Sequence, residues 1–321
     1  MIKLVEGVLK KENLKAKRIK AIKLTKGNLI FQADDKYIIR IKEGKEGCRK
    51  LKFKAELIRM IEKEIPVANV VAFDRYEGVS YLIQKYIAGQ TLFQTWPRLT
   101  PVYREKLIAN LVSFLNNLHA HEAPKFGIPY DSGLQFESWQ EFCCFRFEKL
   151  ISEISSLPAS RTAEPVLGLV ARYFKKHKHY LKSEKAVLLH GDLWPANILV
   201  RGHEIRAIID FEFALWGPPD YEFFLTLQFC LFPSEAGGEK RYLPENFRDY
   251  WQLLRKYYPK AFSFPRIDER LNLYLILHNL GLYKVSLEGR KSNKFNSFSI
   301  DPLLKILIFL FDPGAKLYFW T

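Results

Sequence analysis

Residues 187–220 read VLLHGDLWPANILVRGHEIRAIIDFEFALWGPPD, and this stretch decides how the whole chain is interpreted. It contains two short apolar segments, Ile198–Val200 and Ile205–Ile209, separated by the turn residues Arg201–Glu204. Short apolar runs joined by a turn are typical of an antiparallel hairpin. Pairing the segments around this turn places Ile198 opposite Ala207.

Polar residues flank the predicted hairpin. Asn197 precedes its first strand and Asp210 follows its second, so we expect both side chains to emerge side by side at the open end. Their oxygens are the hard ligands that Mg²⁺ prefers. His190 and Asp192 lie upstream and complete the order H-x-D-x-x-x-x-N, the spacing of the protein-kinase catalytic loop, whose Asp accepts a hydroxyl proton. We expect Asp192 to act as the base and His190 to brace the loop through hydrogen bonds.

HGDLWPANILV followed by IIDFEFALWGPPDYEF resembles the aminoglycoside phosphotransferase and choline kinase superfamily, within the protein-kinase-like fold. The resemblance covers nearly the whole chain. It implies an α+β, two-lobed fold with a small antiparallel-sheet N-terminal lobe and a larger, mainly helical C-terminal lobe. It also implies an ATP- and Mg²⁺-dependent kinase that phosphorylates a hydroxyl of a small molecule. Asp192 would be its catalytic base, and Asn197 and Asp210 would hold magnesium.

The same resemblance implies how the N-terminal lobe binds the nucleotide. Arg40 resembles the basic residue of the third strand that touches the phosphates, and Glu56 resembles the helix glutamate that pairs with it. Residues 82–89, LIQKYIAG, resemble the hinge whose backbone binds adenine. The adenine-binding residues of this hinge would be Lys85, Tyr86 and Ile87.

The chain also departs from the superfamily pattern. Trp194 and Ala196 stand where many members have His and Gly, and a Trp at this position resembles fructosamine kinases. The glycine-rich loop is reduced to TKGN, residues 25–28. Arg40 replaces the more familiar lysine, and its guanidinium suits bidentate phosphate binding. Lys42 lies two residues on, on the same strand face, and is the alternative phosphate ligand.

The remaining pattern predicts a sheet-rich N-terminal lobe at 1–87 and a helical C-terminal lobe at 88–321, joined at residues 85–89. In the first lobe we expect a short amphipathic helix in residues 1–19, a helix at 50–64, and strands at 21–25, 28–33, 37–42, 70–74 and 80–84. In the second lobe we expect helices at 101–121, 139–155, 165–182, 220–231, 246–257, 269–287 and 302–311.

Charge and composition narrow the choice of function. The chain has 321 residues, 50 Lys+Arg and 35 Asp+Glu, and residues 1–87 alone hold 21 basic and 11 acidic residues. Such a positive field attracts anions without identifying them. The four cysteines lack metal-ligand spacing and are expected to be reduced thiols. With no signal-peptide core or membrane-spanning apolar run in the sequence, we expect a cytoplasmic protein.

Several alternatives stay open at this stage. The acceptor could be a sugar, a ketosamine, an amino alcohol or an aminoglycoside-like molecule. Residues 88–321 hold 29 basic against 24 acidic residues, which disfavours a polycationic acceptor. A catalytically silent, kinase-like nucleotide-binding scaffold is the main alternative. No nucleic-acid-binding signature is present, so no nucleic-acid partner is expected, although the nine basic residues in 1–26 could meet another anionic surface. The pattern does not indicate an oligomeric state or choose between ATP and GTP.

Overall fold

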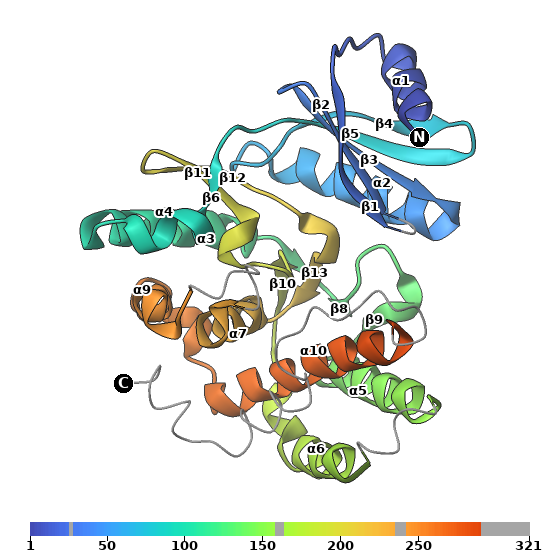
Figure 1. Cartoon of the computed structure of the whole chain (residues 1–321). Coiled ribbons are helices and arrows are strands. Elements are labelled where there is room, and N and C mark those ends of the chain that lie inside the picture. The colour runs from blue at the N-terminus through green and yellow to red at the C-terminus, as the bar shows by residue number, and fades with distance from the viewer. Residues whose placement is uncertain (26–27, 158–163, 235–241, 290–321) are drawn as a thin grey trace. The chain divides into compact units, whose positions relative to one another are not determined.

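The computed structural model describes residues 1–25, 28–157, 164–234 and 242–289, and Figure 1 labels their helices and strands. The described backbone forms two compact units. The first unit comprises Met1–Leu118 and Pro195–Phe213, and the second comprises His119–Trp194 and Ala214–Thr321. The expected nucleotide-binding part, 1–87, and acceptor-binding part, 88–321, stay predictions, because backbone contacts do not report which residues bind a ligand.

A five-stranded antiparallel sheet organises the first unit, with the strand order β1-β2-β3-β5-β4. Its strands are β1 (Ile19–Thr25), β2 (Asn28–Ala33), β3 (Tyr37–Glu43), β4 (Val70–Tyr76) and β5 (Val79–Lys85). All five predicted strands of this lobe are therefore present, with slightly longer ends. The β1–β2 pairing continues to Thr25 and Asn28, while two residues of the reduced glycine-rich loop, 26 and 27, lie outside the described part of the chain.

One helix covers each face of this sheet (Figure 1). Helix α1 (Ile2–Lys11) packs its apolar side on a core that includes Tyr81 and Ile83 of β5. Helix α2 (Gly44–Ile61) packs on a core that includes Leu82, the residue between them. Because successive side chains of a strand point to opposite faces, the two helices must lie on opposite sides of the sheet.

Helix α2 begins at Gly44 and not at Lys50, the residue at which the sequence pattern placed its start. The stretch GKEGCRK, residues 44–50, carries no apolar repeat, so its helical character leaves no periodic signal. Glycine at position 47 permits a close approach between this first turn and β3. A Cβ there would lie only 2.8 Å from the Cβ of Lys42.

The remaining helices and strands of the first unit come from two parts of the chain: the segment that follows the five-stranded sheet, up to residue 118, and the segment after residue 194. They are β6 (Gln90–Thr91), α3 (Leu92–Thr95), α4 (Pro101–Leu118), β11 (Ile198–Arg201) and β12 (Glu204–Ile208). A small antiparallel sheet in the order β12-β11-β6 contains the predicted hairpin.

The hairpin pairs as predicted near its turn and differs at its open end. A β-bulge leaves Arg206 without a partner residue, so Ile198 lies opposite Ile208 and not opposite Ala207. The extra residue of a bulge shifts every later pair by one. The prediction of the register was therefore wrong beyond the bulge, although the two strands and their turn are present.

The second unit combines a sheet of short strands with five described α-helices. The sheet order is β7-β10-β13-β8-β9. Its strands are β7 (Glu122–Ala123), β8 (Phe126–Gly127), β9 (Gln135–Phe136), β10 (Ala186–Leu189) and β13 (Leu215–Gly217). The helices are α5 (Trp139–Ser155), α6 (Glu164–His177), α7 (Phe224–Leu231), α9 (Arg248–Tyr257) and α10 (Ile267–Gly289). The predicted helix at 302–311 lies outside the described residues, and no described helix combines the length and apolarity needed to cross a bilayer.

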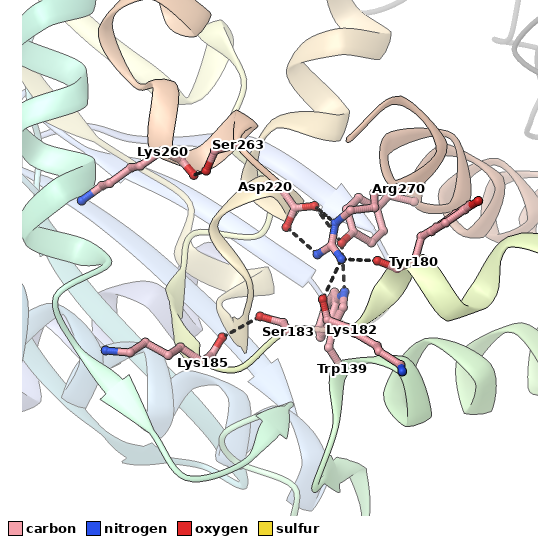
Figure 2. Close-up of polar contacts among 10 residues, drawn as sticks. Trp139, Tyr180, Lys182, Ser183, Lys185, Asp220, Lys260, Ser263 and Arg270 are labelled. Carbon is pink, nitrogen blue, oxygen red and sulfur yellow. Dashed lines mark hydrogen bonds and ion pairs between the residues drawn. The ribbon is translucent and has the colours of Figure 1, made fainter. Parts of the chain in front are cut away.

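A buried ion pair ties three segments of the second unit together (Figure 2). Asp220 and Arg270 are almost completely buried, and the guanidinium makes two hydrogen bonds to the carboxylate, of 2.5 and 3.0 Å. Its third nitrogen donates to the main-chain oxygens of Tyr180 and Lys182. Tyr274 completes the network, because its hydroxyl donates to Asp220 over 3.1 Å. Asp220 is thus a structural residue of the second unit.

Replacing Arg270 by methionine is expected to lower the free energy of unfolding by about 3–5 kcal/mol, because it leaves a buried carboxylate without its counter-charge. Denaturant unfolding of the wild type and the variant measures this loss. Lys185→Met is the matched control, since Lys185 makes an exposed ion pair with Glu122 that contributes at most about 1 kcal/mol. Equal losses for the two variants would contradict the structural role of Arg270.

The second unit also contains a histidine that folding keeps neutral. Burial, helped by the charge of Arg146, lowers the pKa of His278 from 6.5 to about 4. The unfolded chain therefore binds a proton at a higher pH than the folded chain, and stability falls as the pH drops from about 6.5 to 4. The loss amounts to about 3 kcal/mol at the lower end. Denaturant unfolding at a series of pH values measures this loss. The free energy of unfolding of His278→Phe should depend less on pH between 6.5 and 4 than that of the wild type. An equal pH dependence for the two proteins would contradict the role of His278.

Candidate active site

Five charged side chains of the first unit meet at the end of β12. Arg40 and Lys42 come from alternate positions of β3, Lys54 comes from α2, and Asp210 and Glu212 follow β12. Arg40 Nη2 lies 3.4 Å and Lys54 Nζ lies 3.0 Å from the same oxygen, Asp210 Oδ1. Lys42 forms a direct ion pair with Glu212. We call these five residues the charged cluster.

The hairpin brings Asn197 to the same edge of the first unit. The amide of Ile209 donates a 2.9 Å hydrogen bond to the main-chain oxygen of Asn197, so the backbones on either side of the open end are adjacent. Asp210 has a φ of 71°, a left-handed conformation that Asp adopts more readily than most residues and that redirects the chain after β12. The predicted juxtaposition of Asn197 and Asp210 is therefore confirmed for the backbone, in spite of the bulge.

The charged cluster holds more positive than negative charge: three cations face two carboxylates. Lys54 is only 2% exposed, and burial together with the charge of Arg40 lowers its pKa to about 8, although Asp210 opposes the shift. Arg40 is 9% exposed, and its Nε and Nη1 are buried with no hydrogen-bond partner among the described residues. Buried donors without acceptors are costly, so this guanidinium is suited to receive an anion.

A hydrogen-bonded loop of the second unit carries Asp192. Glu222 accepts hydrogen bonds from the amides of His190 and Gly191, over 2.7 and 3.0 Å. His190 Nδ1 accepts a 3.2 Å hydrogen bond from the main-chain amide of Asp192. The main-chain oxygen of the next residue, Leu193, accepts a hydrogen bond from the hydroxyl of Thr226. The backbone of Asp192 is thus fixed from both sides, and His190 braces the loop as expected.

Glu222 is itself held in place by buried contacts within the second unit. It is 1% exposed, and its carboxylate lies 3.4 Å from His119 Nε2. The other ring nitrogen of His119 lies 2.7 Å from the hydroxyl of Tyr258. Sequence reasoning missed Glu222, although a glutamate within the apolar stretch YEFFLTLQF, residues 221–229, is a signal of a buried polar contact.

A model of the phosphotransferase enzyme family matches residues 19–257 of the chain. The chain belongs to this family. Its structure resembles that of a thermostable mutant of aminoglycoside phosphotransferase APH(4)-Ia, solved as a ternary complex with AMP-PNP and hygromycin B. The two chains are 16% identical, the TM-score is 0.64, and the match covers 89% of this chain and 92% of the other.

Two further solved structures are similar to this phosphotransferase over almost their whole length. The gentamicin complex of APH(2")-IIa has 18% identity and a TM-score of 0.63, and 98% of each chain is covered. The ADP-bound aminoglycoside phosphotransferase APH(2'')-Ib has 15% identity and a TM-score of 0.63, with 99% of each chain covered. No curated protein sequence matches the chain. The likeness confirms the predicted α+β, protein-kinase-like fold.

The expected ion pair between Arg40 and Glu56 is not formed in this phosphotransferase. Glu56 lies on the exposed side of α2, with its carboxylate 3.8 Å from Lys52, while Arg40 pairs with Asp210. Residues two apart on a helix point to nearly opposite sides, so the helix that buries Lys54 must turn Glu56 outward. The sequence contained a signal for this, because Lys54 lies three and four residues from Leu51 and Ile58 on the apolar face.

The three hinge residues differ in what their backbone can still bind. The amide of Lys85 donates to the main-chain oxygen of Asn69, and the amide of Tyr86 donates to that of Lys36. The amide of Ile87 has no such acceptor among the described residues. Of the three predicted adenine-binding residues, only Ile87 therefore has a main-chain amide that is available among the described residues without breaking a bond within the protein.

The donor set at the hairpin end fits a magnesium ion. Asn197 offers an amide oxygen and Asp210 a carboxylate, which are the hard ligands that Mg²⁺ takes alongside phosphate oxygens. Asn197 and Asp210 belong to the first unit, whereas Asp192 belongs to the second. Their joint action on one substrate remains a prediction.

Proposed function

We propose that this phosphotransferase moves the γ-phosphoryl group of ATP to a hydroxyl of a small molecule, with Mg²⁺. The observation that carries the proposal is the buried guanidinium of Arg40, which has two unpartnered donors and lies beside Asp210. Family membership supports the reaction class. Structural relatives hold AMP-PNP with hygromycin B, ADP or gentamicin, which supports a nucleotide donor and a hydroxyl-bearing acceptor.

Each part of the chain then has a distinct role in the proposed reaction. Arg40 binds phosphate oxygens through Nε and Nη1, and its neighbour Lys42 stays paired with Glu212. The amide of Ile87 donates to the adenine. Asn197 and Asp210 would hold magnesium, which neutralises charge on the phosphates when it is bound.

Asp192 orients the acceptor hydroxyl and takes its proton. The hydroxyl oxygen forms a new bond to the γ-phosphorus while the bond from that phosphorus to the bridging oxygen breaks, and ADP leaves with the electron pair. A fixed carboxylate suits this role, because phosphoryl transfer depends mainly on positioning and charge neutralisation. The loop anchored by Glu222 and Thr226 supplies that fixed backbone.

The acceptor is proposed as a neutral or zwitterionic metabolite, such as a sugar, a ketosamine or an amino alcohol. Residues 88–321 carry a net positive charge, which does not favour a polycation, although an aminoglycoside-like acceptor stays among the candidates. Trp194 favours a sugar-like molecule. Its ring lies 5.9 Å from that of Phe229 and its side chain is only partly buried.

A metabolite-library screen for magnesium-dependent ADP release tests the proposal, with Asp192→Asn as the blank. We expect at least one hydroxyl compound to raise ADP release above that of the variant. Nucleotide binding without ADP release, with any acceptor or with water, would instead favour the catalytically silent scaffold. Running the screen with GTP beside ATP identifies the nucleotide.

A further inference from the structure

Lys54 is the least expected member of the charged cluster. Lysine is rarely buried completely unless it is paired, yet Lys54 is 2% exposed on the inner face of α2. Its Nζ makes one hydrogen bond among the described residues, to Asp210 Oδ1, and Arg40 approaches the same oxygen. One carboxylate oxygen thus serves two buried cations, and each cation keeps donors for a further acceptor.

The charge of the cluster shows what that acceptor must be. Three cations and two carboxylates leave one positive charge, and a buried excess charge requires a counter-ion. If residue 54 were a carboxylate, the same cluster would carry one negative charge. Lys54 therefore makes the cluster attractive to an anion, whereas a carboxylate at position 54 would repel one.

The unused donors point to the same kind of ligand. Arg40 Nε and Nη1 lack partners among the described residues, and the ammonium of Lys54 has three N–H groups for its single bond. Lys42 does not share this property, because Glu212 holds it. Two converging cations with free donors fit a phosphate, whose several oxygens can accept from both at once.

We propose that Lys54 is a phosphate-binding residue that, with Arg40, lets this enzyme bind its nucleotide partly without magnesium. The proposal rests on the proposed function, because it takes the nucleotide to be the anion. Lys54 Nζ and Arg40 Nη2 converge on Asp210 Oδ1 over 3.0 and 3.4 Å, so an anion that binds beside this oxygen meets both cations.

Calorimetric titration of the full chain with ATP, once with Mg²⁺ and once with EDTA, tests this role. We expect the wild type to bind ATP in EDTA, and Lys54→Met to weaken that binding about 10- to 100-fold, the value of one charge-assisted hydrogen bond. With Mg²⁺ present the loss should be smaller. Lys54→Arg keeps the charge and should retain metal-free binding. Lys52→Met is the matched control, because Lys52 lies on the same helix with an exposed side chain.

Each outcome of this titration is decisive. Wild-type binding that requires magnesium, or metal-free binding that is equal in the wild type and in Lys54→Met, would overturn the role of Lys54 and leave the proposed function standing. An absence of binding under both conditions would overturn the proposed function itself. Circular dichroism establishes that each variant is folded, and Lys54→Arg provides the comparison if Lys54→Met does not fold.

Discussion

Asp192→Asn is expected to lower the rate of phosphoryl transfer by about 10²- to 10⁴-fold, the contribution of a general base. Asparagine has the same shape as aspartate but does not accept the proton of the acceptor hydroxyl. The loop itself should persist, because its hydrogen bonds to Glu222, His190 and Thr226 use main-chain atoms of residues 190–193. Steady-state rates with a saturating acceptor measure the effect, and nucleotide affinity should stay within about threefold of the wild type.

The matched control for this prediction is a carboxylate in the same unit that has no expected role. Glu137 is exposed, and its one ion pair within the described part of the chain is a surface contact with Lys125, so Glu137→Gln should leave the rate unchanged. A rate for Asp192→Asn that equals the rate of this control would show that Asp192 is not the base. A lower rate caused solely by weaker nucleotide binding would likewise contradict its role.

Asp210→Asn is expected to remove the dependence of nucleotide binding on magnesium. Asparagine tolerates the left-handed backbone of this position, whereas alanine would add strain, so the substitution tests the charge and leaves the fold intact. In the wild type Mg²⁺ should strengthen ATP binding, because Asp210 would ligate the ion. In the variant, calorimetry with Mg²⁺ and with EDTA should give nearly equal affinities, and turnover should fall by at least about 10²-fold.

The same variant links the proposed metal site to the charged cluster. Without the carboxylate of Asp210, Lys54 and Arg40 lose their shared partner, so metal-free ATP affinity should be equal to or higher than that of the wild type. A magnesium effect of wild-type size in Asp210→Asn would contradict the assignment of Asp210 as a metal ligand.

The parts of the fold that follow a short-range pattern could be predicted from the sequence. Alternating and helical periodicity predicted the strands of the first unit and helix α5 over 139–155. The turn at 201–204 predicted the hairpin. The bulge at Arg206 was missed, although Ala207 and Ile208 are consecutive apolar residues that interrupt the alternation of β12.

The candidate site shows where sequence reasoning reaches its limit. The motif predicted the juxtaposition of Asn197 and Asp210, because a hairpin fixes it locally. The resemblance assigned the side chain of α2 that faces Arg40 to Glu56, but the structure places Lys54 there and turns Glu56 outward. The two assignments differ by a rotation of α2 about its axis, which the resemblance alone does not fix. Glu222 was missed for a related reason: its partners, residues 190 and 191, are more than thirty positions away in the chain.

The most direct test of the central claim is the identity of the product. Purified enzyme is incubated with ATP, Mg²⁺ and the acceptor found in the screen, and the products are followed by ³¹P NMR. We predict a new phosphate monoester signal that grows in step with ADP and is absent with Asp192→Asn. ADP accompanied only by inorganic phosphate, or an ester signal of equal size in the variant, would contradict the claim that this chain phosphorylates a hydroxyl through Asp192.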